Sequence, residues 1–363
     1  MTLSLSRRSL LRAVAAAPLA LTASRRLTWA QQAAGPAPNN VWAATTGPIL
    51  DALADLPPRV YVPHENGGDI AVIDPLTRQI VDRYPVGRTP HHVTPAYDLS
   101  RLYVNVMGSN RLVEIDIQTG RPARWIPVAT PYNLYFALDG SLAVVAAEPF
   151  NRLDFFDPIT WAPIRRVPVR ASGIDHLDFA ADGSYLLVSA EFSGHVARVD
   201  VGQLAVAGVL SVGGLPIDVK LAPEGDLFYV ANQGRRGVSI IDPDAMREVG
   251  FLRTGRGAHG LAISRDTRAL YVSNRIEGSI SVIDFATREV VDRWPIGGSP
   301  DMLQVSPDGA ELWASGRSHG VVYVVDTASG VLLDRIRTGN APHGLTYFPQ
   351  PGRFSLGHNG VYR

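Results

Sequence analysis

The chain has 363 residues and no net formal charge, because its 34 lysines and arginines balance 34 aspartates and glutamates. A protein that binds nucleic acid usually shows a basic excess, so we expect no nucleic-acid partner. The sequence contains no cysteine, which excludes disulfides, thiolate metal sites, cysteine-linked haem and cysteine-linked lipid anchors.

Residues 1–30 have the pattern of an export signal. The basic stretch SRRSLLR at residues 6–12 precedes the short apolar run AVAAAPLALTA, which is too short to span a bilayer. SRRSLLR resembles the twin-arginine signal, with Leu10 and Arg12 at its Phe and Lys positions; an ordinary secretory signal with two arginines is the alternative. Small residues favour cleavage after Ala30. We therefore predict a periplasmic protein whose mature chain has no transmembrane segment.

Residues 31–56 are rich in Ala, Pro and Asn and are predicted to be a linker with one helical turn near 49–54. From residue 57 onward the sequence repeats. An aspartate that ends a short apolar strand recurs at spacings of 42, 41, 43, 42, 42 and 42 residues. These residues are Asp74, Asp116, Asp157, Asp200, Asp242, Asp284 and Asp326. A period of about 40–50 residues with four strands in each repeat is typical of a β-propeller.

One repeat, residues 270–309, shows the four strands clearly. LYVSN, SISVID, EVVDRWPI and DMLQVS are rich in β-branched and aromatic residues, and Gly, Pro and Asp separate them. The aspartate that ends SISVID is suited to a turn, because its carboxylate can accept hydrogen bonds from backbone amides just after it. The predicted fold is therefore all-β, a seven-bladed propeller of four-stranded antiparallel blades.

The two ends of the repeat region are each incomplete. The first repeat begins at the second strand of a blade, Arg59–His64, and the last inner strand, at residues 342–348, has no partners after it. The N-terminal strands B–D and the C-terminal strand A are therefore predicted to complete one blade, which closes the ring and leaves no exposed edge. This assigns residues 57–348 to the propeller and residues 349–363 to a tail that either covers one mouth of the ring or lies along its outside. We expect a monomer.

The second strands VYVPHEN, LYVNVMG, FYVANQG and LYVSNRI, with their following turns, resemble the Tyr-Val-Thr-Asn (YVTN) β-propeller repeat family. The resemblance covers about residues 57–348 and implies the fold. That family includes surface-layer and periplasmic proteins. Its repeat is similar to that of the propeller lactonases and of the haem-carrying propeller of dissimilatory nitrite reductase, so the resemblance leaves the function open.

The start of the inner strand and the end of the second strand lie on one face of a propeller. Six of the nine histidines fall on this face: His64, His91, His92, His176, His259 and His343. The predicted metal ligands are His92, His176, Glu148 and Glu191, which suit a divalent ion such as zinc or manganese. The predicted ligand-binding residues are His91, His259, His343, Arg275 and Arg317. A tetrapyrrole with His259 or His343 as axial ligand is the second cofactor hypothesis.

Each of these residues also has a structural interpretation. A histidine at this turn can hydrogen-bond the backbone of the neighbouring blade. Arg275 and Arg317 could hold a carboxylate or phosphate, or they could pair with Glu277 or Asp301. Alternate inner-strand positions are more polar and are predicted to face a wet channel: Thr94, Tyr135, Asp178, Lys220, Ala262, Gln304 and Thr346.

The sequence thus predicts a propeller that binds a small ligand, metal or cofactor at its histidine-rich mouth, or that binds a periplasmic protein. The alternative is a metal-dependent hydrolase or lyase of the propeller lactonase type. H-E-x-x-H does not occur in the sequence, and no catalytic residue is assigned.

Overall fold

The computed structural model describes residues 40–357 and 361–363. The predicted signal peptide, the first part of the predicted linker and His358 lie outside the described residues. Among those described, no helix has both the length and the hydropathy needed to cross a membrane.

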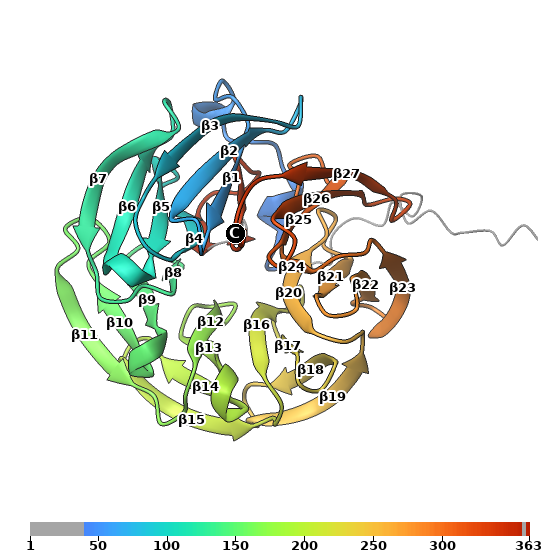
Figure 1. Ribbon diagram of the computed structural model, residues 1–363. Coiled ribbons are helices and arrows are strands. Elements are labelled where there is room, and N and C mark those ends of the chain that lie inside the picture. The colour runs from blue at the N-terminus through green and yellow to red at the C-terminus, as the bar shows by residue number, and fades with distance from the viewer. Residues whose placement is uncertain (1–39, 358–360) are drawn as a thin grey trace, which may run out of the picture. The chain divides into compact units, whose positions relative to one another are not determined.

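Seven antiparallel sheets surround a central axis, which confirms the predicted seven-bladed propeller (Figure 1). The strands of each blade follow one another from the channel outward. Blade 1 contains β28 (Thr346–Phe348), β1 (Arg59–His64), β2 (Asp69–Asp74) and β3 (Gln79–Pro85). Blade 2 contains β4 (Pro90–Pro95), β5 (Arg101–Val106), β6 (Arg111–Asp116) and β7 (Arg121–Pro127). Blade 3 contains β8 (Asn133–Phe136), β9 (Ala143–Ala147), β10 (Arg152–Phe156) and β11 (Pro163–Pro168).

The remaining blades follow the same order. Blade 4 contains β12 (Ile174–Phe179), β13 (Tyr185–Ala190), β14 (His195–Asp200) and β15 (Ala205–Ser211). Blade 5 contains β16 (Pro216–Leu221), β17 (Phe228–Asn232), β18 (Gly237–Asp242) and β19 (Arg247–Arg253). Blade 6 contains β20 (Ala258–Ile263), β21 (Ala269–Asn274), β22 (Ser279–Asp284) and β23 (Glu289–Pro295). Blade 7 contains β24 (Pro300–Val305), β25 (Glu311–Gly316), β26 (Val321–Asp326) and β27 (Leu332–Arg337).

The recurring aspartate forms the turn between the third and fourth strand of every blade. Asp116 Oδ1, for example, accepts a hydrogen bond of 2.7 Å from the backbone amide of Thr119, and Asp326 Oδ1 accepts one of 2.7 Å from Ser329. The other five aspartates of the series accept equivalent bonds. The sequence period therefore has a direct physical cause, because each turn needs a short acceptor side chain at this position.

The two ends of the propeller close the ring as predicted. β28 pairs antiparallel with β1, so that Val60 lies opposite Tyr347 and Tyr61 opposite Thr346. Just before β28, Gly344 forms a parallel bridge with His92 of β4. The closing segment therefore contacts the inner strand of blade 2 as well as its own blade.

A side chain also hydrogen-bonds across each of the seven blade junctions. Most of these side chains are the polar residues that were expected to face a wet channel; they are buried and hold neighbouring blades together instead. The bonds join Thr346 to the Val93 carbonyl, Thr94 to the Leu134 carbonyl, the Leu177 amide to the Tyr135 hydroxyl, the Leu221 amide to Asp178, the Leu261 amide to Asp218, Ser273 to the Asp301 carbonyl, and the Tyr347 amide to Gln304.

The segments before and after the propeller lie at the end of the channel where the inner strands finish. Residues 40–56, which had been predicted to be a linker, include the 3₁₀ helices η2 (Ala43–Thr46) and η3 (Asp51–Leu53). Trp42 is buried and donates a hydrogen bond of 3.0 Å to the Leu221 carbonyl.

The C-terminal tail reaches the same end of the channel. Its strands β29 (Ser355–Gly357) and β30 (Val361–Tyr362) extend the sheet of blade 3 inward from β8, and Figure 1 shows the C-terminus near the ring centre. The Arg363 guanidinium lies over the Trp42 ring and donates to the carbonyls of Phe179 and Ala180. The structure therefore shows the tail over one mouth of the central channel, which was the first of the two positions considered for it.

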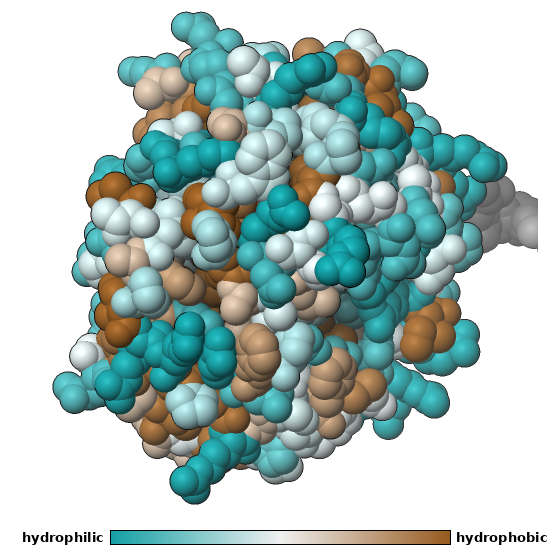
Figure 2. All heavy atoms as spheres, turned by 60° about the vertical axis from the view of Figure 1, so that its left-hand side comes forward, coloured by the Kyte–Doolittle hydropathy of each residue, from teal (hydrophilic) through white to brown (hydrophobic). Residues whose placement is uncertain are grey.

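The outer surface is mixed in polarity. Trp125 on β7 and Ile164 on β11 are exposed among charged neighbours. On the flank seen in Figure 2, hydrophobic residues are scattered among hydrophilic ones rather than gathered in one continuous patch. The apolar side chains are concentrated between the blades instead, in clusters that link each blade to the next.

We predict that the closing segment contributes strongly to stability. Leu345→Ala should lower the free energy of unfolding by about 2–5 kcal/mol, because Leu345 is fully buried between the first and last blades and its loss leaves a cavity. Leu333→Ala is the matched control, since Leu333 on β27 is 43% exposed. Its effect should stay near 0.5 kcal/mol or below in urea unfolding. Equal losses in the two variants would show that closure contributes little.

Candidate functional site

Five histidines meet where the inner strands begin. His91 and His92 lie on β4, His176 on β12 and His259 on β20, while His343 lies in the segment before β28. Each of these side chains is at most 3% exposed, as is Asp301 on β24. The structure thus confirms that these five histidines converge on one end of the channel, although they are widely separated along the chain.

An irregularity at the start of the inner strands explains why His91 and His92, which are neighbours in sequence, both reach this cluster. In a regular strand, consecutive side chains point to opposite faces. The pairing of β4 with β5, however, shifts register between Pro90 and Val93, and equivalent shifts occur in blades 4, 5, 6 and 7. Such shifts re-aim side chains and are common beside functional sites.

The imidazole rings form one continuous group. The His91 ring centroid lies 4.0 Å from that of His343 and 4.7 Å from that of His92. The His92 ring is 4.9 Å from His343 and 5.3 Å from His176, and the His259 ring is 6.0 Å from His343. The Tyr132 ring is packed 4.1 Å from His91. His343 and His92 therefore each lie next to three other imidazoles of the group.

Among the described residues, two sets of three have donor atoms close enough together to hold a metal ion. The first set is His91, His92 and His343, and the second is His259, Asp301 and His343; within each set the donor atoms lie within 4.8 Å of one another. In the second set, Asp301 Oδ1 lies 2.7 Å from His259 Nδ1 and Asp301 Oδ2 lies 3.7 Å from His343 Nε2.

The electrostatics of the site favour neutral imidazoles. Burial lowers the pKa of His91, His259 and His343, and it lowers that of His176 to about 4. Burial alone would raise the pKa of Asp301, but His259, Arg275 and Arg317 outweigh this effect and hold it below its ordinary value. A neutral imidazole next to an ionised carboxylate is the state in which both groups can bind a cation.

Several polar atoms of the site lack the hydrogen bonds that buried groups normally have. Within residues 40–357 and 361–363, His91 Nδ1, both ring nitrogens of His343 and Asp301 Oδ2 are buried without a hydrogen-bond partner. Leaving one such atom unpaired costs roughly 1–3 kcal/mol. Their clustering at one point therefore indicates a place for a ligand that accepts lone pairs.

Three carboxyl groups lie beside the histidines. Glu148 begins η5 (Glu148–Phe150), Glu191 begins η6 (Glu191–Ser193), and Asp175 precedes His176 on β12. Burial, reinforced by Asp175, raises the pKa of Glu191 to about 7, and burial also raises the pKa of Asp175 and Glu148. A similar short helix, η4 (Met107–Ser109), occupies this position in blade 2.

The structure groups the predicted metal ligands differently from the sequence analysis. Of His92, His176, Glu148 and Glu191, only His92 belongs to either of the two sets found in the described part of the chain. His91, His259 and His343, which were predicted to bind a ligand, supply most of the donors. Asp301 was not predicted as a donor. Its position at the start of an inner strand, equivalent to that of His259, is the signal that could have identified it.

The two arginines predicted to bind an anion take part in ion pairs. Arg275 lies 3.5 Å from Asp301 Oδ1, and Arg317 pairs with Glu65. Glu277, the other partner considered, pairs instead with Arg293 at 3.1 Å. Both arginines therefore have the kind of ion-pair partner that the structural interpretation expected, with Glu65 as the partner of Arg317.

Two histidines outside this cluster, His64 and His319, have local partners. His64 Nδ1 lies 2.6 Å from Asp69 Oδ1 within blade 1, so His64 serves its own blade. The His319 ring is 3.0 Å from the Ser299 hydroxyl and is exposed.

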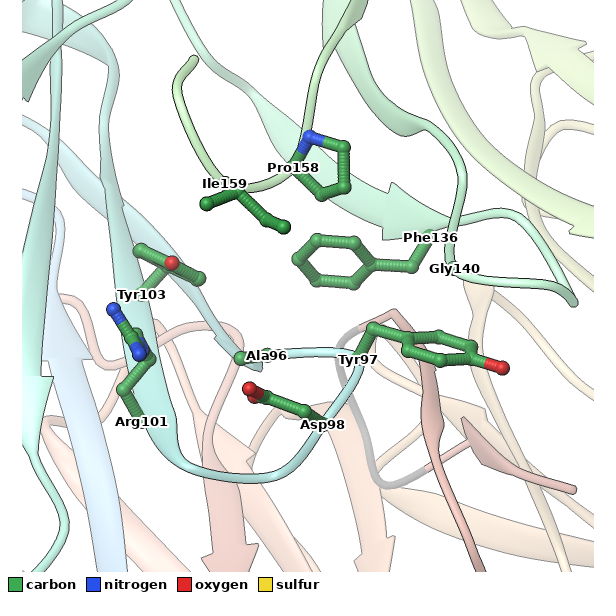
Figure 3. Close-up of a pocket in the computed structure, with 9 residues that line it drawn as sticks. All are labelled: Ala96, Tyr97, Asp98, Arg101, Tyr103, Phe136, Gly140, Pro158 and Ile159. Atoms are coloured by element: carbon green, nitrogen blue, oxygen red, sulfur yellow. The ribbon is translucent and has the colours of Figure 1, made fainter.

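A separate pocket of about 170 Å³ lies at the opposite end of the inner strands, between blades 2 and 3 (Figure 3). Phe136, Tyr103 and Ile159 form its apolar walls. Its charged groups are already bonded, since Asp98 accepts from Ser100 and Arg101 donates to Ser100 and pairs with Glu114. The histidine cluster, with its unpaired buried atoms, is therefore the stronger candidate for chemistry.

Comparison with known proteins agrees with the fold. A family model described as a YNCE-like beta-propeller matches residues 23–351. A search of curated proteins gave no match. Solved structures with similar folds include a chain of hydrazine synthase from Kuenenia stuttgartiensis, at 20% identity and a TM-score of 0.67, with 77% of this chain and 98% of that chain covered.

Two further structures are similar in the same way. A functionally unknown protein from Desulfotomaculum acetoxidans has 17% identity and a TM-score of 0.71, over 80% of this chain and 99% of that one. The dihydro-heme d1 dehydrogenase NirN, solved in complex with DHE, has 15% identity and a TM-score of 0.62, over 86% of this chain and 82% of that one. At these identities the likeness shows the fold alone.

The raised pKa of Glu191 predicts a pH effect on stability. With a pKa of about 7 instead of the ordinary 4.5, the folded protein retains a proton that the unfolded chain has already lost, so stability falls as the pH rises through this window. Glu191→Gln should reduce that fall in urea unfolding measured from pH 5 to 8. Glu289→Gln, an exposed control on β23, should leave it unchanged. Identical pH profiles for Glu191→Gln and the native chain would contradict the assignment.

Proposed function

The chain belongs to the YNCE-like beta-propeller family, and from this premise we propose that it is an exported protein that binds a divalent transition-metal ion among the histidines at its channel mouth. The observation that carries the proposal is the cluster of buried, unpaired donor atoms on His91, His343 and Asp301. A cation bound there would interact with these atoms, which have no hydrogen-bond partner among the described residues.

The donor types fit an ion such as zinc. Neutral imidazole and carboxylate are common zinc ligands, and other ions of this class, including copper and nickel, also accept imidazole. Zinc binds imidazole nitrogen at about 2.0–2.1 Å, which places ligands of one tetrahedral ion about 3.4 Å apart. Side-chain rotations that bring donors from within 4.8 Å to this spacing would complete the site.

The spacing of the rings favours an ion over a tetrapyrrole. NirN is described as a complex with DHE, and axial histidine ligation is familiar in haem proteins. In this chain, however, the imidazoles pack at 4.0–6.0 Å from one another, so a flat macrocycle against His259 or His343 would have to separate them. An ion needs only the space between the rings.

The surroundings of the site are compatible with the two other functions considered. A lactonase-type hydrolysis would require the bound ion together with a base, and Glu191, with a pKa of about 7, is suited to that task. Docking of a periplasmic protein would use Phe150 and Phe192, which are 51% and 61% exposed beside Glu148 and Glu191. Metal binding is a condition for the first of these and is independent of the second.

We predict that the protein, stripped with a chelator, takes up zinc with an affinity that depends on His343. His343→Ala should weaken binding by more than the roughly 10–100-fold that loss of an outer-shell partner costs, because it removes a donor common to both sets. The measurements are calorimetric titration and metal analysis of the dialysed protein. His319→Ala, an exposed histidine outside both sets, is the control. No uptake by the native chain would overturn the proposal.

Export is a separate part of the proposal and has its own test. Substitution of both Arg7 and Arg8 by Lys should leave the full-length chain in the cytoplasmic fraction of a bacterial host, because the arginine pair is the feature that resembles the twin-arginine signal. Fractionation with immunoblotting measures the outcome. Unchanged delivery to the periplasm would favour the ordinary secretory signal, and retention of the unaltered chain in the cytoplasm would refute export.

A further inference from the structure

His343 belongs to both sets of metal donors. Apart from this residue the sets have no member in common: His91 and His92 come from blade 2, whereas His259 and Asp301 come from blades 6 and 7. The remaining donors therefore come from blade 2 on one side of blade 1, which His343 precedes, and from blades 6 and 7 on the other. Donor atoms of the two sets do not together form one group within 4.8 Å, so a single ion would use only one set fully.

The two nitrogens of the His343 ring are both available. Each is buried, and neither has a hydrogen-bond partner within the described residues. Nε2 lies 3.7 Å from Asp301 Oδ2 and so faces the second set. The rings of His91 and His92 lie at 4.0 and 4.9 Å from the His343 ring.

From this geometry we propose that His343 bridges two metal ions: Nε2 binds one ion with His259 and Asp301, and Nδ1 binds another with His91 and His92. The inference rests on the proposed metal-binding function and deepens it. Both positions take divalent ions that accept imidazole, and the position with Asp301 has the harder donor set.

The proton balance follows from the bridge. A neutral imidazole carries one N–H proton and one lone pair, so it can bind one ion without losing a proton. When the second ion binds, that proton leaves to solvent and the ring becomes an imidazolate with two metal–nitrogen bonds. Metal binding releases protons in this way wherever a ligand must be deprotonated.

The charge around the site bears on whether two ions are tolerated. Arg275 and Arg317 oppose a second cation, but each is already paired with a carboxylate, Asp301 and Glu65. Beyond these pairs, the imidazolate supplies one further negative charge directly.

The test is a titration of the chelator-stripped full chain with Cu²⁺, followed by electron paramagnetic resonance. The native chain should bind two equivalents, with about one more proton released for the second ion than for the first. Two imidazolate-bridged copper ions are magnetically coupled, so the signal per copper should fall below that of a single-ion sample. This measurement needs no variant and therefore does not depend on any variant folding.

Variants assign the two positions. Asp301→Asn and His92→Ala should each reduce the stoichiometry to one ion and restore the full signal per copper, whereas His319→Ala should retain two coupled ions. One equivalent in the native chain, or two equivalents without coupling, would overturn the bridge and leave the proposed metal binding intact. No binding at all would overturn both.

Discussion

At each of the seven blade junctions, a side chain of one blade forms a hydrogen bond with the backbone of the next blade. The rest of the structure depends on this ring of bonds. Inner strands of adjacent blades do not pair as a sheet, so amides such as those of Leu177, Leu221 and Leu261 need other partners. A buried amide without one would cost free energy comparable to a lost hydrogen bond. Tyr135, Asp178 and Asp218 meet this need, which explains why polar residues occupy buried positions of the inner strands.

The same ring of bonds separates structural polar groups from candidate functional ones. Asp178 and Asp218 each accept a hydrogen bond from a backbone amide of the next blade. Each also has a cationic neighbour: Arg363 lies 3.6 Å from Asp178, and Lys220 lies 3.3 Å from Asp218. At the mouth the pattern changes: within the described part of the chain, both nitrogens of His343 and one oxygen of Asp301 have no hydrogen bond. Arg317 was chosen as a ligand-binding residue because of its residue type, and it is paired with Glu65. Buried polar groups that have no hydrogen-bond partner in the fold are therefore better evidence for a ligand than residue type alone.

Sequence reasoning predicted the fold because the relevant constraints are local. The turn aspartates, such as Asp116, fix the period, and the missing inner strand before Arg59 fixes the mode of closure. The convergence of the histidines followed from strand order alone. Which of them share a donor set did not follow, because it depends on the register shift near His91 and His92, and alternation in a regular strand would have placed those side chains on opposite faces. Asp301 was considered only as an ion-pair partner for Arg275 or Arg317, although it begins its strand as His259 does.

The position of the donors links the site to the closure of the ring. His343 lies in the closing segment, whose next residue, Gly344, bridges to His92 on blade 2. Any ion bound with His91 and His92 therefore joins the last inner strand to blade 2, and an ion bound with His259 and Asp301 joins it to blades 6 and 7. Because opening the ring would separate these donors, binding energy at the site would add to the free energy that keeps the ring shut. Arg363 of the tail is hydrogen-bonded at the opposite end of the channel. An ion at the histidine end would therefore contact the closing segment at the end of the channel away from Arg363.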